Sequence, residues 1–193
     1  MGVLAMFDIK NTKLALGARR RLSRAVRRLG RRQDGSAAVE FGLIAAPFLA
    51  LTFAIMETAI IFFSGQALET AVADSARLIM TGQAQTQGFS QTQFKNAVCA
   101  KIFGLFDCQN GVYVDVKTFT TFANVTMNSP VDSGGNFVNN FTYNPGGPGD
   151  IVVVRLFYQW PVYVSIMGFN LQNMSGGKRL LAATAAFRNE PYQ

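Results

Sequence analysis

The sequence predicts an α+β protein. A long N-terminal helix crosses a membrane and continues into an outer domain that also holds a short second helix and a small antiparallel sheet. Three observations support this fold: a long apolar run follows an arginine-rich segment, a capped helical pattern lies near mid-chain, and three later stretches are rich in β-branched and aromatic residues. Since 193 residues suffice for one ordinary domain with appendages, we expect one folded domain rather than two.

The positive charge of the chain is concentrated before the apolar run. Ten of the 18 lysines and arginines lie between Lys10 and Arg32, and against Asp8 and Asp34 they give this segment a net charge of +8 (10 minus 2). From Ser36 onward, 8 basic and 9 acidic residues give a net charge of −1. The charge therefore belongs to a leader segment, and we expect no specific nucleic-acid binding by the domain.

The apolar run at 41–56 carries no charged residue, and the stretch at 58–63 extends it beyond Glu57. A helix needs about 20 such residues to cross a bilayer. Because basic residues flank only its N-terminal side, the positive-inside rule puts the N-terminus in the cytoplasm and the later residues outside. The alternative, a buried helix of a soluble protein, is disfavoured by that one-sided charge. The expected divisions are a leader at 1–35, a transmembrane helix at 36–63 and an outer domain at 64–193.

The helix is expected to continue beyond the membrane to about Thr81. Leu68, Val72 and Ile79 keep an apolar stripe on one face, with charged residues on the others. Gly82 then provides a C-terminal stop.

A second, shorter helix is predicted after Phe89. Ser90 is the expected N-cap, Gln93 completes a capping box, and Phe89 and Phe94 stand in the positions of a hydrophobic staple. This helix should end before Gly104 and carry Cys99, with Cys108 in the loop beyond it.

Three stretches predict the strands of an antiparallel sheet: Val112–Phe122, Ile151–Trp160 and about Arg179–Phe187. The small residues in the last stretch leave a helix as an alternative there. Between the first two strands, the segment 129–150 is rich in Asn, Gly, Ser and Pro and is predicted to be a loop.

Aromatic residues interrupt the predicted loop. Phe137, Phe141 and Tyr143 either form an exposed docking patch, as aromatics do at interfaces, or tuck under the loop.

The side chains that most often carry catalysis and metal binding are scarce. The chain has no His, which removes the commonest general base and the commonest metal ligand. Cys99 and Cys108 are too few for a zinc site without His. We therefore expect no enzymatic activity, cofactor or metal. In an oxidising compartment the two cysteines are expected to form one local disulfide, and the alternative is a pair of buried free thiols.

A processing signal stands in front of the apolar helix. Gly35 is followed by Ser36, two alanines and a valine, and then by Glu40 and Phe41. This order resembles class III, type IV prepilin-like signals, in which a prepilin peptidase cuts after the Gly and leaves Glu at the fifth mature position.

A longer segment resembles one family. Residues 35–77 are similar to the N-terminal region of TadE-like proteins, the minor pilins or pseudopilins of tight-adherence (Flp-type) pilus systems. The shared features are the Ala-Val-Glu-Phe start, an early Pro, an acidic residue near the far end, and Gln-Ala-Leu followed by small residues that end in Ala-Arg. The C-terminal FRNEPYQ at 187–193 also resembles the family's ending.

The resemblance implies a pilin-like outer domain and a place in the bacterial inner membrane, with the domain in the periplasm. Processing would involve Gly35, Ser36, Glu40 and Phe41, and the partners would be the prepilin peptidase, other pilus subunits and an assembly platform. In the family, the charge pair between Glu40 and the new α-amino group of Ser36 helps a subunit enter the pilus. The alternative for Glu40 is an interfacial carboxylate that reaches water.

Two further residues in the span have an expected role in assembly. Pro47 lacks a backbone N–H, so a local kink near Leu43 is predicted, which subunits would use on leaving the bilayer or which is merely tolerated in a membrane helix. Glu57 pairs with a basic residue of a partner helix or, as favoured here, is solvated at the outer membrane edge. The competing function is an uncleaved, single-pass envelope protein whose outer domain binds a ligand or another subunit.

Overall fold

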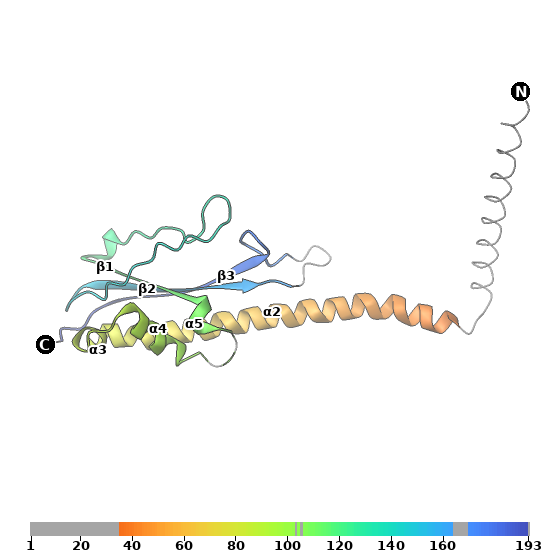
Figure 1. Ribbon diagram of the computed structural model, residues 1–193, viewed down its shortest axis with the longest axis horizontal. Helices are drawn as coiled ribbons and strands as arrows, with labels where there is room; N and C mark the ends of the chain where they lie inside the picture. The colour runs from red at the N-terminus through yellow and green to blue at the C-terminus, as the bar shows by residue number, and fades with distance from the viewer. Residues whose placement is uncertain (1–34, 103, 105, 164–169, 193) are drawn as a thin grey trace, which may run out of the picture. The chain divides into compact units, whose positions relative to one another are not determined.

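The computed structural model describes residues 35–102, 104, 106–163 and 170–192, so the leader predicted at 1–35 lies outside the described residues except for Gly35. The chain divides into two compact units, 1–52 and 53–193, and each is described by itself. The fold is α+β, as the sequence predicts (Figure 1).

The first described helix, α2 (Ser36–Met80), confirms the predicted long helix. The predicted apolar stripe is confirmed, because Leu68, Val72 and Ile79 are all buried. At its C-terminal end the N–H of Gly82 donates to the carbonyl of Ile79 at 3.0 Å. Gly82 has a φ of 78°, a left-handed conformation that glycine adopts at little cost and that ends the helix.

The predicted second helix is α4 (Gln91–Cys99), which follows the short α3 (Gln83–Thr86). Its capping box is complete. The Gln93 N–H donates to Ser90 Oγ at 3.3 Å, and the Ser90 N–H donates to Gln93 Oε1 at 2.8 Å. The loop expected around Cys108 differs, because Cys108 begins a further helical turn, α5 (Cys108–Gly111).

The sheet has three antiparallel strands in the order β1-β2-β3. They are β1 (Val112–Phe119), β2 (Ile151–Pro161) and β3 (Lys178–Arg188). The third stretch is therefore a strand, because it pairs with β2 along its whole length. The first strand ends three residues earlier than predicted, and Phe122–Asn124 form a 3₁₀ turn, η2.

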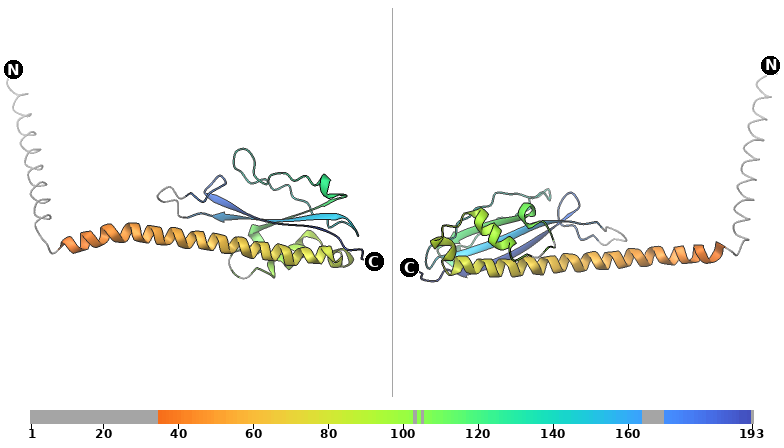
Figure 2. Two further views of the ribbon diagram at one scale, coloured as in Figure 1. Left: turned by 180° about the vertical axis from the view of Figure 1, so that it is seen from behind. Right: turned by 60° about the horizontal axis from the view of Figure 1, so that its bottom comes forward.

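The two faces of the sheet are covered differently within the second unit. One face, which includes Val114, Val154 and Ala183, packs in one hydrophobic core with the C-terminal part of α2 and with α4. The segment 129–150 lies over the other face, as the front and back views agree (Figure 2). Because both faces of the central strand are covered, Ile151–Phe157 is buried without alternation.

Candidate functional site

The start of α2 places the residues of the predicted processing signal. Gly35 is exposed, and no atom lies within 4 Å of the position that a Cβ on it would take. One helical turn further, Glu40 Oε1 accepts a hydrogen bond of 2.6 Å from the hydroxyl of Ser36. Residues four apart face each other on a helix, so the spacing from Ser36 to Glu40 brings the two side chains together.

This arrangement suits a charge pair at the same place. An α-amino group on Ser36 would stand on the residue whose hydroxyl already reaches Glu40. Four residues rise about 6 Å along a helix, which is within reach of a glutamate side chain. An amine at Ser36 and the Glu40 carboxylate could therefore neutralise each other within one turn.

From this pair to Met56 the surface of α2 is mostly apolar and exposed, and Phe41 is 74% exposed. An 18-residue window of α2 has a mean hydropathy of 2.0, and none of it is buried. Among the described residues, α2 alone is long and apolar enough to cross a membrane, which is consistent with a single-pass protein. Pro47 lies inside this helix, and the kink expected near it stays a prediction.

Glu57 lies in the second unit, and its environment differs from the solvated membrane edge favoured above. The residue is only 9% exposed. Its Oε1 accepts a hydrogen bond of 2.6 Å from the backbone N–H of Tyr163, just beyond β2. The carboxylate thus contacts its own chain, so the solvated interpretation is wrong, whereas a role for Glu57 in assembly stays a prediction.

The predicted disulfide is present between Cys99 and Cys108. It ties the end of α4 to the start of α5, nine residues on. Next to it, Asp107 caps α5, because its Oδ1 accepts the Asn110 N–H at 3.1 Å and its Oδ2 accepts the Asn110 side-chain amide at 2.7 Å. The Asn110 side chain first, and the backbone N–H groups after it, lower the pKa of Asp107, which keeps this carboxylate ionised.

Sequence reasoning missed a buried ion pair in the sheet. Asp115 on β1 and Arg155 on β2 are register partners, and Asp115 is fully buried. The Asp115 carboxylate also accepts the Thr142 N–H at 3.0 Å, and Arg155 Nη1 donates to the Asn128 carbonyl at 2.9 Å. The pair therefore holds both sides of the segment 129–150 onto the sheet. The available signal was the presence of charged residues inside apolar strands: Asp115 and Lys117 in β1, and Arg155 in β2.

The aromatic residues of the segment 129–150 pack inward. Phe137 lies 4.7 Å from the ring of Tyr113, and Phe141 stacks at 5.0 Å on Phe157 (ring centroids). Tyr143 lies 5.6 Å from Phe94, on the side of α4. Of the two alternatives stated above, an exposed docking patch and a position under the loop, the ring contacts support the second. Burial raises the pKa of Tyr143 to about 12.

Among the described residues, no group of three or more Cys, Asp or Glu side chains is placed to hold a metal ion. The candidate functional features are instead an accessible bond between Gly35 and Ser36, the Ser36–Glu40 pair and the apolar surface of α2.

Comparison with known proteins gives one match. The family model described as TadE-like protein matches residues 35–77, the same segment whose residues carry the resemblance. The resemblance to this family is confirmed over the matched segment, which contains the Ser36–Glu40 pair, Pro47 and Glu57. Neither a curated protein nor a solved structure matches the chain significantly.

Proposed function

We propose that this chain is a minor pilin or pseudopilin of a tight-adherence (Flp-type) pilus, cut after Gly35 by a prepilin peptidase. The observation that carries the proposal is the TadE-like match at 35–77, because that family is structural and pilus-associated. Within the matched segment, the exposed Gly35 and the hydrogen-bonded Ser36 and Glu40 stand where a class III signal would need them.

The proposed location is the bacterial inner membrane, with the N-terminus in the cytoplasm and the domain after α2 in the periplasm. The exposed apolar surface of α2 supports the anchor. The ten basic residues before Gly35 support the orientation, since such clusters stay on the cytoplasmic side. The same charge then belongs to the leader that the peptidase removes.

Cleavage would convert the Gly35–Ser36 amide into a free amine on Ser36. An unpaired carboxylate in hydrocarbon is costly, and an ammonium group one turn away offsets that cost. The mature helix would then begin with a neutralised pair followed by the apolar surface that contacts other subunits. Bending at Pro47 would ease its exit from the bilayer, and Glu57 would hold the membrane-proximal end of the outer domain.

Cleavage is tested on the full chain, co-expressed with a prepilin peptidase and extracted in detergent. Intact mass and N-terminal sequencing should find a chain that begins at Ser36. Gly35→Leu should leave the full-length chain. Gly42→Leu is the matched control, because no atom lies within 4 Å of a Cβ at either glycine, and it should be cut normally. A wild-type chain that stays uncut beside an active peptidase would refute the proposal and favour the uncleaved, membrane-anchored envelope protein.

Assembly is tested separately, on chains whose cleavage has been verified. Glu40→Gln removes the charge that would pair with the amine, so the amount of this subunit in sheared or cross-linked pilus fractions should fall at least tenfold. Glu69→Gln is the control, because Glu69 is an exposed glutamate on the same helix. Equal incorporation of both variants would assign Glu40 to the membrane interface only.

A further inference from the structure

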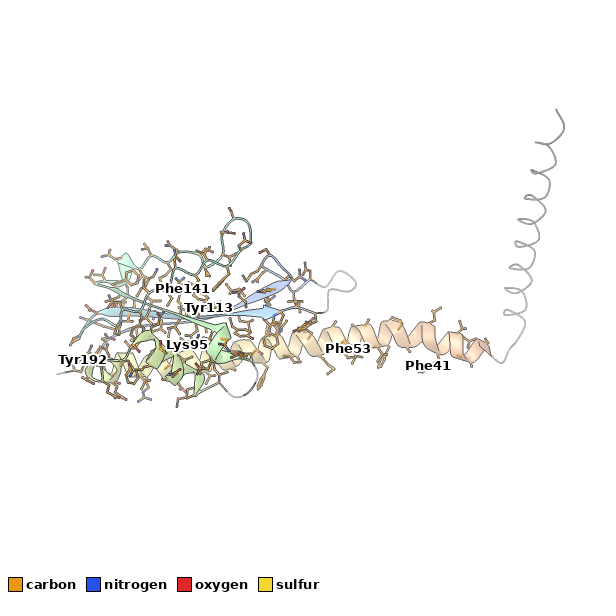
Figure 3. All side chains as sticks on the ribbon, in the orientation of Figure 1. Phe41, Phe53, Lys95, Tyr113, Phe141 and Tyr192 are labelled. Carbon is orange, nitrogen blue, oxygen red and sulfur yellow. A yellow bond between two sulfur atoms is a disulfide. The ribbon has the colours of Figure 1, made fainter. Side chains whose placement is uncertain are left out.

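A surface pocket of about 430 Å³ lies at the outer edge of β1, in a size range typical of small-ligand sites. Three segments that are distant in sequence form it: α4, β1 and the segment 129–150. Figure 3 labels one side chain from each of them, Lys95, Tyr113 and Phe141. The polar and aromatic lining residues are Gln91, Thr92, Lys95, Tyr113, Asn139 and Phe141.

The walls of the pocket are held in place by interactions already described. The disulfide Cys99–Cys108 fixes the end of α4 close to the start of β1. The stacking of Phe141 on Phe157 and the hydrogen bond from the Thr142 N–H to Asp115 hold the opposite wall. A preformed site loses little conformational entropy when a ligand binds, and this favours high affinity.

Lys95 gives the pocket a positive charge without a direct partner. Among the described residues, the Lys95 ammonium makes no hydrogen bond and no ion pair within 4 Å, and the acidic residue that attracts it at longer range is Asp107. Burial lowers the pKa of Lys95, and the attraction of Asp107 partly opposes that effect. A partly buried cation with open donors favours an anionic ligand.

The remaining lining groups favour a sugar over a peptide. Two aromatic rings, the Gln91 side-chain oxygen, the Asn139 carboxamide and the Thr92 hydroxyl combine apolar surface with several hydrogen-bonding groups, as a ring with hydroxyl groups requires.

A peptide would instead need open backbone groups on β1. Several of those groups are occupied: the Val112 N–H donates to the Cys108 carbonyl, and the Val114 carbonyl accepts the Gln91 side-chain amide at 2.8 Å. Further along, Val116 exchanges hydrogen bonds with Thr142 and Asn144. Little of this edge is therefore open to an extended peptide.

We propose that this pocket binds an acidic saccharide, with Lys95 on the carboxylate and the rings of Tyr113 and Phe141 against the sugar. The inference is independent of cleavage after Gly35, since all of these residues belong to the second unit. It adds a ligand to the assembly role proposed above: a polysaccharide that carries uronate groups.

The test uses the full chain in phosphatidylcholine nanodiscs, which present no anionic lipid, and titrates it calorimetrically with trigalacturonate. Binding should weaken at least tenfold in Lys95→Gln, because a charge-assisted hydrogen bond is lost. It should be unchanged in Lys101→Gln, an exposed lysine outside the pocket. Asn139→Ala, an exposed change that spares the core, should weaken binding severalfold.

Three further ligands test whether the pocket recognises both the carboxylate and the sugar ring. The neutral methyl ester of trigalacturonate should bind at least tenfold more weakly than the acid, and acetate should not bind measurably. Equal binding of the ester, equal affinity in Lys95→Gln, or binding of acetate as tight as that of the trisaccharide would overturn the proposal. So would tighter binding of a glutamate-rich peptide.

Discussion

Asp115 and Arg155 face each other across β1 and β2, and both Arg155 Nε and Nη2 contact Asp115 Oδ2, at 3.1 Å and 2.6 Å. Removal of one partner leaves a buried charge, so Arg155→Met should lower the free energy of unfolding by about 3–5 kcal/mol. The change is measured by guanidinium unfolding of the detergent-solubilised chain, followed through the fluorescence of Trp160, its single tryptophan.

The double variant Asp115→Val with Arg155→Met is the control for this pair. Because it removes both charges, it should recover more than half of the lost free energy. The single variant Asp115→Val completes the comparison. If the double variant loses as much unfolding free energy as Asp115→Val and Arg155→Met lose together, the pair acts through something other than mutual charge compensation.

Tyr143 carries a buried hydroxyl that has no hydrogen-bond partner among the described residues. Tyr143→Phe should therefore raise the free energy of unfolding by about 1 kcal/mol, because it removes an unsatisfied polar group and keeps the ring against Phe94. The same unfolding measurement at neutral pH tests this. A loss of stability would mean that the hydroxyl is satisfied in solution.

The Tyr143 hydroxyl also predicts a loss of stability in alkali. Burial raises its pKa from 10.0 to about 12 in the folded chain, so the folded state disfavours tyrosinate. Below about pH 10 this hydroxyl is neutral in both the folded and the unfolded state, so its ionisation costs no stability. The free energy of unfolding falls as the pH rises from about 10 toward 12, because the unfolded chain loses the proton first. Tyr143→Phe should flatten this decline without abolishing it, since burial also raises the pKa of Tyr158.

Gly82 ends α2 and lies against the C-terminal tail. A Cβ on Gly82 would overlap the ring of Tyr192, and the φ of 78° already disfavours other residues. Gly82→Ala should therefore cost about 1–3 kcal/mol of unfolding free energy. Gly88→Ala separates the two causes, since Gly88 has a φ of 63° but no atom within 4 Å of a Cβ. It should cost about 1 kcal/mol. Equal costs would mean that the Tyr192 contact contributes nothing.

The elements that could be predicted from sequence are those specified by neighbouring residues. The capping box at Ser90 and Gln93 spans three residues, and the apolar stripe of Leu68, Val72 and Ile79 repeats within one helix, so each is readable from a short window. The strands carry the same kind of local signal. The predicted processing signal is likewise contiguous, so Gly35 and Glu40 could be proposed from the sequence alone.

The missed contacts join residues that are far apart in sequence. Asp115 and Arg155 are 40 residues apart, and Glu57 and Tyr163 are 106 apart. Their pairing depends on strand register and on how β2 passes α2, and no local pattern encodes either. A charged residue in an apolar stretch therefore indicated that a partner exists, but not which residue it is.

The disulfide should stabilise the outer domain and hold its pocket. Cys99 and Cys108 are nine residues apart in the sequence, so the bond between them closes a short loop. Loss of the bond in Cys99→Ser with Cys108→Ser should lower the free energy of unfolding by about 2–3 kcal/mol, because the unfolded chain gains entropy. A reductant should destabilise the wild-type chain by a similar amount and leave the double variant unchanged. An effect of reductant on the double variant would contradict this origin.

Glu57 should contribute to the stability of the second unit, 53–193, whether or not it acts in assembly. A carboxylate that accepts a backbone N–H at 2.6 Å makes a charge-assisted hydrogen bond, and Glu57→Ala leaves the Tyr163 N–H without that acceptor. The unfolding free energy should fall by about 1–3 kcal/mol. Glu57→Gln keeps an acceptor oxygen and should lose less than half of that, while the exposed Glu69→Ala on the same helix should change stability by under about 0.5 kcal/mol. If Glu57→Gln folds as stably as the wild type but fails to enter pilus fractions, its charge acts on a partner. If Glu57→Ala is as stable as Glu69→Ala, the contact with Tyr163 does not hold the domain.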